Sequence, residues 1–181
     1  MHCADRERYP QRGMLRPPLR HAETMPKPSE TLACTPPTVV IDTQVVMDWL
    51  VFNDQRVAPL VQALTAGTLQ WLGQAAMLAE LRHVLGRGVA ASFSPNLPLI
   101  EQAFARYCLM VERMPAPAVR LVCRDPDDQM FIDLALAERA CWLISRDRAV
   151  LALAKRARAQ GLTILTPEHW VQQQARSREQ A

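Results

Sequence analysis

Residues 38–50 read TVVIDTQVVMDWL, and the order of strand and helix signals within them indicates the class of fold. The segment opens with a continuous apolar, β-branched run, which is typical of a strand buried on both faces of a sheet. The run ends at Asp42, and apolar residues then recur at helical spacing from Val45 to Leu50. A buried strand that leads directly into a helix is characteristic of α/β proteins.

The alternation of strands and helices continues along the chain. Further strands are predicted at residues 69–72, 119–123, 141–145 and 162–165. Helices are predicted at residues 57–66, 74–85, 97–113, 126–139 and 148–160, and from a cap at residues 166–168. The helix at 126–139 is expected to begin at Pro126, with Asp125 as its N-cap. This order predicts a parallel sheet covered by helices on both faces.

Length and composition favour a single domain. The chain has 181 residues, 49% hydrophobic and 22% charged, which suffices for one core and leaves little for a second. Residues 1–37 hold half of the 14 prolines without apolar periodicity, so a disordered Pro- and Arg-rich extension is expected before a domain at 38–175 and a tail at 176–181. No run approaches the ~18 apolar residues of a membrane span, and the N-terminus lacks a secretory apolar region. We therefore expect a soluble, cytoplasmic protein with no membrane partner.

Charge is distributed unevenly behind a formal net charge of +3. Residues 38–138 contain seven Lys and Arg against eleven Asp and Glu, whereas residues 139–181 contain eight against three. An acidic middle followed by a basic end suits metal ions and a polyanion. The five cysteines include no CxxC pair and no zinc-type Cys/His spacing, so we expect reduced, buried thiols in the domain rather than a disulfide framework or a zinc site.

Two aspartates follow predicted strands. Asp42 closes the strand at 38–41, and Asp147 follows Trp142-Leu143-Ile144 after two residues. The functional crevice of an open parallel sheet lies beyond the carboxyl ends of its strands, so the two carboxylates converge if these strands are neighbours. The alternative is that each aspartate only caps the helix that follows it.

Glu80 lies on a predicted helix, beside or within the apolar face that includes Val84. An isolated carboxylate is costly to bury unless a cation or hydrogen bonds compensate its charge. Glu80 is therefore a candidate site residue. The alternative is a place at the edge of the apolar face, where it reaches solvent or pairs with Arg82 or Arg87.

Asp128 is the fourth candidate carboxylate. It shares an inward-facing stripe with Phe131, whereas Asp133 lies roughly 140° away around the helix and is expected in solvent. Asp127 is a weaker candidate. Favourable interaction with the helix dipole is enough to explain one or two of the acids at 125–128 without any further role.

The four carboxylates have a clear chemical purpose if they converge. Their mutual repulsion raises their proton affinity unless a divalent cation lies among them, and oxygen ligands without His or Cys favour Mg²⁺ or Mn²⁺. Such ions activate water and stabilise the charge that develops on a phosphodiester during its cleavage. A phosphate-binding glycine loop and a GxGxxG pattern are both missing, and a phosphatase acting through Asp42 would need a second Asp two residues on.

Four short motifs occur in order between residues 38 and 171. They are Val-Ile-Asp-Thr at 40–43, Ala-Glu-Leu at 79–81, Asp-Pro-Asp-Asp at 125–128 and Ser-Arg-Asp at 145–147, and Ile-Leu-Thr-Pro follows at 164–167. Together they resemble the PIN-domain family, and more narrowly the VapC-like toxins of bacterial toxin-antitoxin systems. The resemblance implies a Rossmann-like three-layer α/β/α sandwich with a mostly parallel central sheet.

The same resemblance implies a metal-dependent endoribonuclease that is the toxin of a toxin-antitoxin pair. The acidic quartet of the family falls on Asp42, Glu80, Asp128 and Asp147, as catalytic residues that hold one or two Mg²⁺ or Mn²⁺ ions. Attack by water on the phosphorus would leave a 5′-phosphate and a 3′-hydroxyl. The implied partners are an RNA substrate and a small antitoxin protein, with a homodimer left open.

Six residues are candidates for supporting the site or binding phosphate: Thr43, Gln44, Asp127, Ser145, Arg146 and Arg148. Ser145 matches the Ser/Thr of the last motif, while Arg146 and Arg148 flank Asp147 and would attract RNA phosphates. Gln44 stands where the family usually has Asn, and Ala149 where it often has a further Asp. These departures leave open the number of bound metals and an alternative function, a PIN-like RNA-binding or regulatory module with weakened catalysis.

Overall fold

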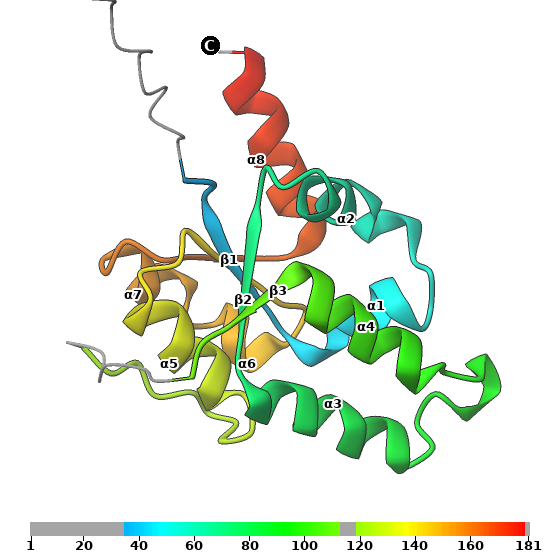
Figure 1. The fold of residues 1–181 in the computed structure, drawn as a ribbon. Coiled ribbons are helices and arrows are strands. Elements are labelled where there is room, and N and C mark those ends of the chain that lie inside the picture. The colour runs from blue at the N-terminus through cyan, green and yellow to red at the C-terminus, as the bar shows by residue number, and fades with distance from the viewer. Residues whose placement is uncertain (1–34, 113–118, 180–181) are drawn as a thin grey trace, which may run out of the picture. The chain divides into compact units, whose positions relative to one another are not determined.

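The structure, a computed structural model, describes residues 35–112 and 119–179. Its strands are β1 (Thr38–Ile41), β2 (Gln70–Gly73), β3 (Cys108–Met110), β4 (Trp142–Ile144) and β5 (Thr163–Leu165). They form a five-stranded sheet in the order β3-β2-β1-β4-β5, and every neighbouring pair is parallel (Figure 1). The predicted α/β fold with a parallel sheet is therefore confirmed.

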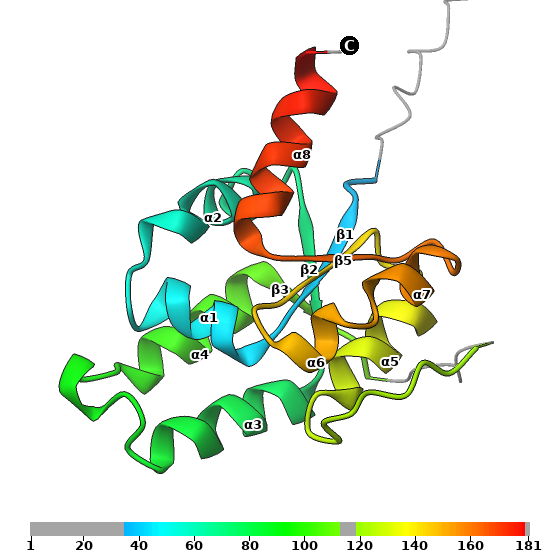
Figure 2. The ribbon, with the colours of Figure 1, turned by 180° about the vertical axis from the view of Figure 1, so that it is seen from behind.

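Helices cover both faces of the sheet (Figures 1 and 2). One face packs against α1 (Thr43–Leu50), α2 (Ala58–Thr65), α4 (Leu97–Tyr107) and α8 (Pro167–Glu179), and the other against α5 (Gln129–Ala137), α6 (Arg148–Leu151) and α7 (Ala154–Arg158). The helix α3 (Ala75–Gly86) crosses the end of the sheet where the strands end, and it contributes to the cores on both faces. Two short 3₁₀ helices, η1 (Gln55–Val57) and η2 (Ala91–Phe93), lie in connections.

Alternate side chains of β1 enter two separate cores. Val39 and Ile41 pack into the core on the α1 side, and Val40 packs into the core on the α5 side. All three are 3% exposed or less. Because both faces of the strand are buried, both sets of side chains are apolar, which explains the unbroken run in the sequence.

The strand order places a ligand-binding position at the end of β1. From β1 the chain adds β2 and β3 on one side, then crosses to add β4 and β5 on the other. The strands β1 and β4 are paired with Ile41 opposite Ile144, which meets the condition under which the sequence placed Asp42 and Asp147 together. Asp42 and Asp147 follow the carboxyl ends of these two strands, at the point where the strand order reverses and α/β sheets bind ligands.

The third strand lies earlier than predicted. It is Cys108–Met110, which the sequence placed inside a helix at 97–113, and residues 119–123 form no strand. Three apolar residues directly after a helix continue its spacing, so periodicity did not separate the strand from the helix. Instead of a strand partner, residues 121 and 123 use the side chain of Gln129, which donates to the Leu121 carbonyl and accepts from the Cys123 N–H at 2.9 and 2.8 Å.

The helix α5 begins three residues later than predicted. Asp125 does not cap a helix at Pro126; its Oδ1 accepts a hydrogen bond from the Asp127 N–H at 3.0 Å, which forms a turn. Asp128 then occupies the N-cap position of a helix that begins at Gln129, without a side-chain capping bond. The prediction of an Asp-Pro helix start was wrong because the aspartate bonds to its own turn first.

The predicted basic helix at 148–160 is divided into α6 and α7. At the division the Leu153 N–H donates to the Val150 carbonyl, only three residues back, so the helix tightens and turns. The Val150 and Leu153 side chains are both buried, because the apolar stripe that predicted one helix continues from α6 into α7.

Several expectations concern other parts of the chain. Residues 1–34 of the predicted extension lie outside the described residues, and α8 continues to Glu179. Cys108 and Cys123 are buried thiols, as expected, but Cys141 is exposed. None of the described helices combines the length with the apolar character that a membrane crossing requires.

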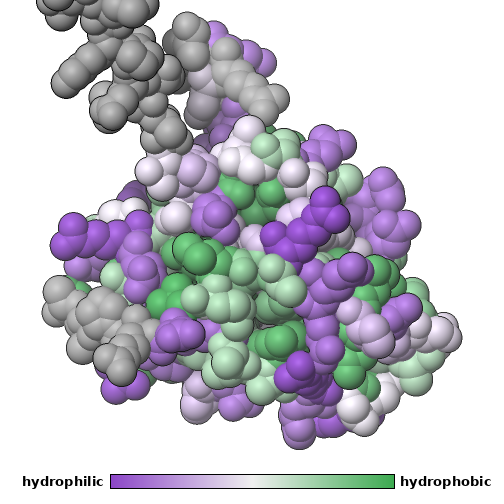
Figure 3. Space-filling model, in the orientation of Figure 1, coloured by the Kyte–Doolittle hydropathy of each residue, from purple (hydrophilic) through white to green (hydrophobic). Residues whose placement is uncertain are grey.

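The edge strand β3 carries exposed apolar side chains. Leu109 and Met110 are 55% and 38% exposed, and green side chains gather on this face of the molecule in Figure 3. A second exposed apolar set lies between the end of α3 and the first turn of α4 and comprises Val89, Phe93, Leu97 and Leu99. Apolar exposure of this kind is typical of surfaces that bind other proteins.

Arg146 joins the end of β4 to two helices. Its Nε lies 2.6 Å from Asp48 Oδ2 on α1, and one of its terminal nitrogens lies 2.6 Å from Glu168 Oε1 on α8. The Arg146 side chain is 17% exposed and that of Asp48 is 9% exposed. A largely buried ion pair is costly to break, because removal of one partner leaves the other charge uncompensated.

We predict that Arg146→Ala lowers the free energy of unfolding by about 3–5 kcal/mol, because Asp48 is left charged and buried. Urea denaturation measures this change. The matched control is Arg82→Ala, which breaks the exposed pair between Arg82 and Glu101 and should cost less than about 1 kcal/mol. If Arg146→Ala lowers the free energy of unfolding by no more than the small loss expected for Arg82→Ala, the Arg146 contacts do not stabilise the fold.

Candidate active site

A cavity of about 470 Å³ lies at the carboxyl end of the sheet. All four carboxylates predicted from the sequence line it: Asp42, Glu80, Asp128 and Asp147. They come from four separate segments, namely the end of β1, the helix α3, the residue before α5 and the residue before α6. The fold therefore gathers around one cavity acids that are up to 105 positions apart in the sequence.

Asp42 is the most buried of these acids, at 3% exposed. Its N–H donates to the Ile144 carbonyl at 3.1 Å, which extends the pairing of β1 with β4, and its Oδ1 accepts from the Val45 N–H at 2.9 Å. Burial raises the pKa of Asp42 to about 6, although hydrogen bonds from Ser145, the Val45 N–H and the Arg146 N–H act in the opposite direction. The carboxylate thus sits where an unneutralised charge is unfavourable.

Asp147 is held by the backbone of α6. Its Oδ1 accepts from the N–H groups of Ala149 and Val150, at 2.5 and 3.4 Å. Among the described residues no donor is bonded to its Oδ2, so the helix cap uses only one oxygen. The capping role and a ligand-binding role are therefore compatible in the same side chain.

Ser145 is hydrogen-bonded to both of these aspartates. It is fully buried, its Oγ accepts from the Asp147 N–H at 2.9 Å, and it is hydrogen-bonded to Asp42. A hydroxyl can accept one bond and donate another at the same time. Ser145 is therefore linked to the Asp42 side chain and to the Asp147 backbone without lining the cavity that the two carboxylates share.

Asp128 and Glu80 also line the cavity, and both are half-buried. Burial, followed by the negative charges of Asp147, Asp125, Asp42 and Asp127, raises the pKa of Asp128 to about 7. The acids of three separate segments thus act on one another electrostatically. Arg82, one of the two arginines that the sequence offered as a partner of Glu80, instead pairs with Glu101 at 2.6 Å.

The donor set fits a hard divalent cation. The acids supply oxygen ligands, and the mutual repulsion seen at Asp128 would be relieved by a positive charge in the cavity. In the described part of the chain, no three His, Cys, Asp or Glu side chains lie close enough together to hold an ion by themselves. Mg²⁺ usually keeps several waters and binds only one or two carboxylates directly, so an open arrangement of acids is compatible with it.

The six supporting candidates occupy different positions. Thr43, Gln44 and Asp127 line the cavity, and the buried Oγ1 of Thr43 has no hydrogen-bond partner among the described residues. Ser145 does not line the cavity, and its hydroxyl is bonded to Asp42 and to the Asp147 N–H. The Arg146 guanidinium is bound to Asp48 and Glu168, away from the acids, whereas Arg148 lines a neighbouring cavity together with Asp147.

One basic residue of the cavity was not predicted. Arg87 lines it at the end of α3, and apolar side chains form the rest of its wall: Met47, Phe52, Val84, Val89 and Phe131. Arg87 follows Glu80 by seven positions, which places both on the same side of a helix. That spacing was the available signal, although from the sequence Arg87 was a candidate only as an ion-pair partner of Glu80.

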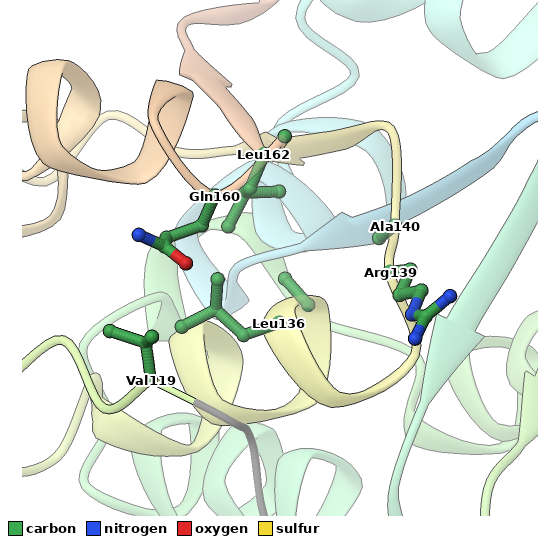
Figure 4. Close-up of a pocket in the computed structure, with 8 residues that line it drawn as sticks. Val119, Leu136, Arg139, Ala140, Gln160 and Leu162 are labelled. Atoms are coloured by element: carbon green, nitrogen blue, oxygen red, sulfur yellow. The ribbon is translucent and has the colours of Figure 1, made fainter.

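A second cavity, of about 320 Å³, is a poorer candidate (Figure 4). It lies at the opposite end of the sheet, beside the residues that precede β4 and β5, and it contains no carboxylate. Its lining is mostly apolar and includes Val119, Leu136, Arg139, Ala140, Gln160 and Leu162. The chemistry of the domain is therefore concentrated at the carboxyl ends of the strands.

Comparison with known proteins agrees with this placement. The family model for the PIN domain matches residues 38–149, a range that runs from β1 to the first turn of α6 and contains all four carboxylates. A search of curated proteins gave no match. PIN domains are generally nucleases, which hydrolyse phosphodiester bonds. With its parallel sheet and its matched range, the chain belongs to the PIN domain family.

Proposed function

We propose that this protein is an endoribonuclease that depends on Mg²⁺ or Mn²⁺ and cuts RNA at the carboxylate cavity. The observation that supports the proposal most strongly is the lining of one cavity by Asp42, Glu80, Asp128 and Asp147 at the switch point of the sheet. A nuclease needs to neutralise the charge of a phosphodiester and to activate a nucleophile. A set of acids that repel one another is suited to hold the cation for that task.

The acids of the site share one task in the proposed reaction, and the residues around them have others. Asp42, Glu80, Asp128 and Asp147 would hold one or two ions, which lower the pKa of a coordinated water and neutralise charge on the phosphate. The backbone of α1 and α6 fixes Asp42 and Asp147, so little reorganisation is needed when substrate binds. Ser145 keeps the two acids in register, and Thr43 offers a hydroxyl at the cavity wall. Hydrolysis by water leaves a 5′-phosphate and a 3′-hydroxyl.

We further propose that the protein is the toxin of a toxin-antitoxin pair, with a small antitoxin protein as its partner. The exposed apolar side chains on β3 and between α3 and α4 support a protein partner, because surfaces of this kind are usually covered by one. A second copy of the chain is the other candidate for such a surface. A small reading frame beside the gene, whose product abolishes cleavage, would be the supporting finding for the antitoxin.

We predict that Asp42→Asn and Asp147→Asn each reduce RNA cleavage at least about 100-fold, because each removes a negative charge that stabilises the transition state through the cation. An asparagine side chain still accepts the capping bonds, so both variants should fold. A gel assay on labelled RNA measures the rate, and circular dichroism checks the fold.

The control for these variants is Asp133→Asn, which makes the same change on α5. Asp133 is bonded to Gln129 and does not line the carboxylate cavity, so its variant should cleave at the wild-type rate. Wild-type rates for Asp42→Asn and Asp147→Asn in the presence of Mg²⁺ would remove these acids from the mechanism.

We predict that Mg²⁺ or Mn²⁺ raises the thermal stability of the wild-type protein, because an ion that binds only the folded state stabilises it by about 2.7 kcal/mol at 100 times its Kd. Differential scanning calorimetry across a metal titration measures the shift, and Asp42→Asn should lose most of it. Mg²⁺ and Ca²⁺ at equal ionic strength separate specific binding from screening.

A stable, RNA-binding protein that neither shifts with metal nor cuts RNA would contradict the nuclease proposal. It would favour the alternative, a PIN-like RNA-binding or regulatory module with weakened catalysis. Two positions support that alternative, since Gln44 lines the cavity where the family usually has Asn, and Ala149 beside Asp147 offers no further carboxylate.

A further inference from the structure

A third cavity, of about 390 Å³, borders the carboxylate cavity. Arg124, Asp125, Pro126, Asp147, Arg148 and Ala149 line it. Asp147 lines both cavities, so the third cavity begins where the carboxylate cavity ends. Its two arginines come from different segments, Arg124 from the loop before α5 and Arg148 from the first position of α6.

Both arginines are available to bind a ligand. They are exposed, and within the described residues neither forms an ion pair. Arg146 differs sharply, because its guanidinium is already bound to Asp48 and Glu168. Of the two arginines that flank Asp147 in the sequence, Arg148 is therefore the one that is exposed and free of ion pairs within the described residues.

Within the described residues, no ion pair joins the acids of the third cavity to these arginines. Asp125 turns its Oδ1 to the Asp127 N–H, and Asp147 turns its Oδ1 to the backbone of α6. The guanidinium donors of Arg124 and Arg148 are left for an anion. A phosphate group matches their planar fork of N–H donors better than a single ammonium group would.

We propose that Arg124 and Arg148 together bind the phosphate next to the one that is cleaved, so that the nucleic acid strand passes over Asp147 from the carboxylate cavity into the third cavity. This proposal rests on the nuclease function proposed above and assigns a direction of exit to its substrate. Arg124 was not a candidate from the sequence, because only the fold brings it beside Arg148. Both are positioning residues, since they hold a phosphate that does not react.

The first test measures binding alone, in EDTA, so that no RNA is cut. Fluorescence anisotropy reports the affinity of a labelled single-stranded RNA for the wild type, Arg124→Ala, Arg148→Ala and the double variant across a range of salt concentrations. Each single variant should bind roughly 10-fold more weakly, because it loses a charge-assisted contact. It should also lower the slope of log K against log salt by about 0.7.

Two controls separate a defined site from general positive charge. Arg156→Ala removes an equally exposed arginine from α7, outside the lining of the third cavity, and should bind as the wild type does. Arg148→Lys keeps the charge but not the planar fork, so it should recover only part of the affinity. Thermal melting confirms that the exposed substitutions leave the fold intact.

The second test measures cleavage with Mg²⁺ of an RNA in which one neutral methylphosphonate linkage is moved along the strand. When the neutral linkage lies at one particular position beside the cleaved bond, it should slow cleavage by the wild type roughly 10-fold. At the same position it should not lower the cleavage rate of the double variant of Arg124 and Arg148 any further. Such coupling between a residue and a single phosphate is evidence for their contact.

The outcomes distinguish this proposal from the nuclease proposal. Wild-type affinity and salt slope in the double variant, or an equal loss in Arg156→Ala, would overturn the phosphate site even if the protein cuts RNA. A wild type that does not bind single-stranded RNA would overturn it as well. Loss of affinity in the arginine variants of a protein that cuts no RNA with any metal would keep the phosphate site and refute the nuclease.

Discussion

The pairing of β1 with β4 is the constraint on which the site depends. It places Ile41 opposite Ile144 and continues through the hydrogen bond from the Asp42 N–H to the Ile144 carbonyl at 3.1 Å. As a result, β1 and β4 end at the same level of the sheet. Ser145, which directly follows β4, can therefore bond to both Asp42 and Asp147. A one-residue slip in this register would move Asp42 relative to Asp147 and turn the side chains of one of the two strands to the opposite core.

Contacts with neighbouring helices, rather than contacts among the acids themselves, stabilise this arrangement of Asp42 and Asp147. Asp42 and Asp147 each use backbone N–H groups of a helix, and Arg146 ties the end of β4 to α1 and α8 through Asp48 and Glu168. Burial, followed by repulsion from the neighbouring acids, raises the pKa of Asp128. Packing and ion pairs elsewhere therefore hold together a group of charges that would otherwise separate, as expected for a site built to receive a cation.

Much of the fold was predictable because the decisive signals are local. The unbroken apolar run of β1 and the aspartate after it required only neighbouring residues, whereas β3 depends on pairing with β2, whose Gly73 allows Cys108 to approach. Four of the five acids that line the cavity were predicted from strand ends and helix faces, and the fifth, Asp127, was a weaker candidate. The different surroundings of Arg146 and Arg148 could not be predicted, because Arg146 pairs with Asp48 and Glu168, 98 and 22 residues away, whereas Arg148 lines a cavity with Arg124.

The proposed function requires that the acids at the ends of β1 and β4 bind a divalent cation for phosphodiester cleavage. Crystals of the wild-type protein soaked in millimolar Mn²⁺, with anomalous diffraction measured at the manganese edge, locate that ion directly. We expect anomalous density in the cavity lined by Asp42, Glu80, Asp128 and Asp147, and its loss in Asp42→Asn. Density confined to other surfaces, or none in this cavity at saturating Mn²⁺, would contradict it.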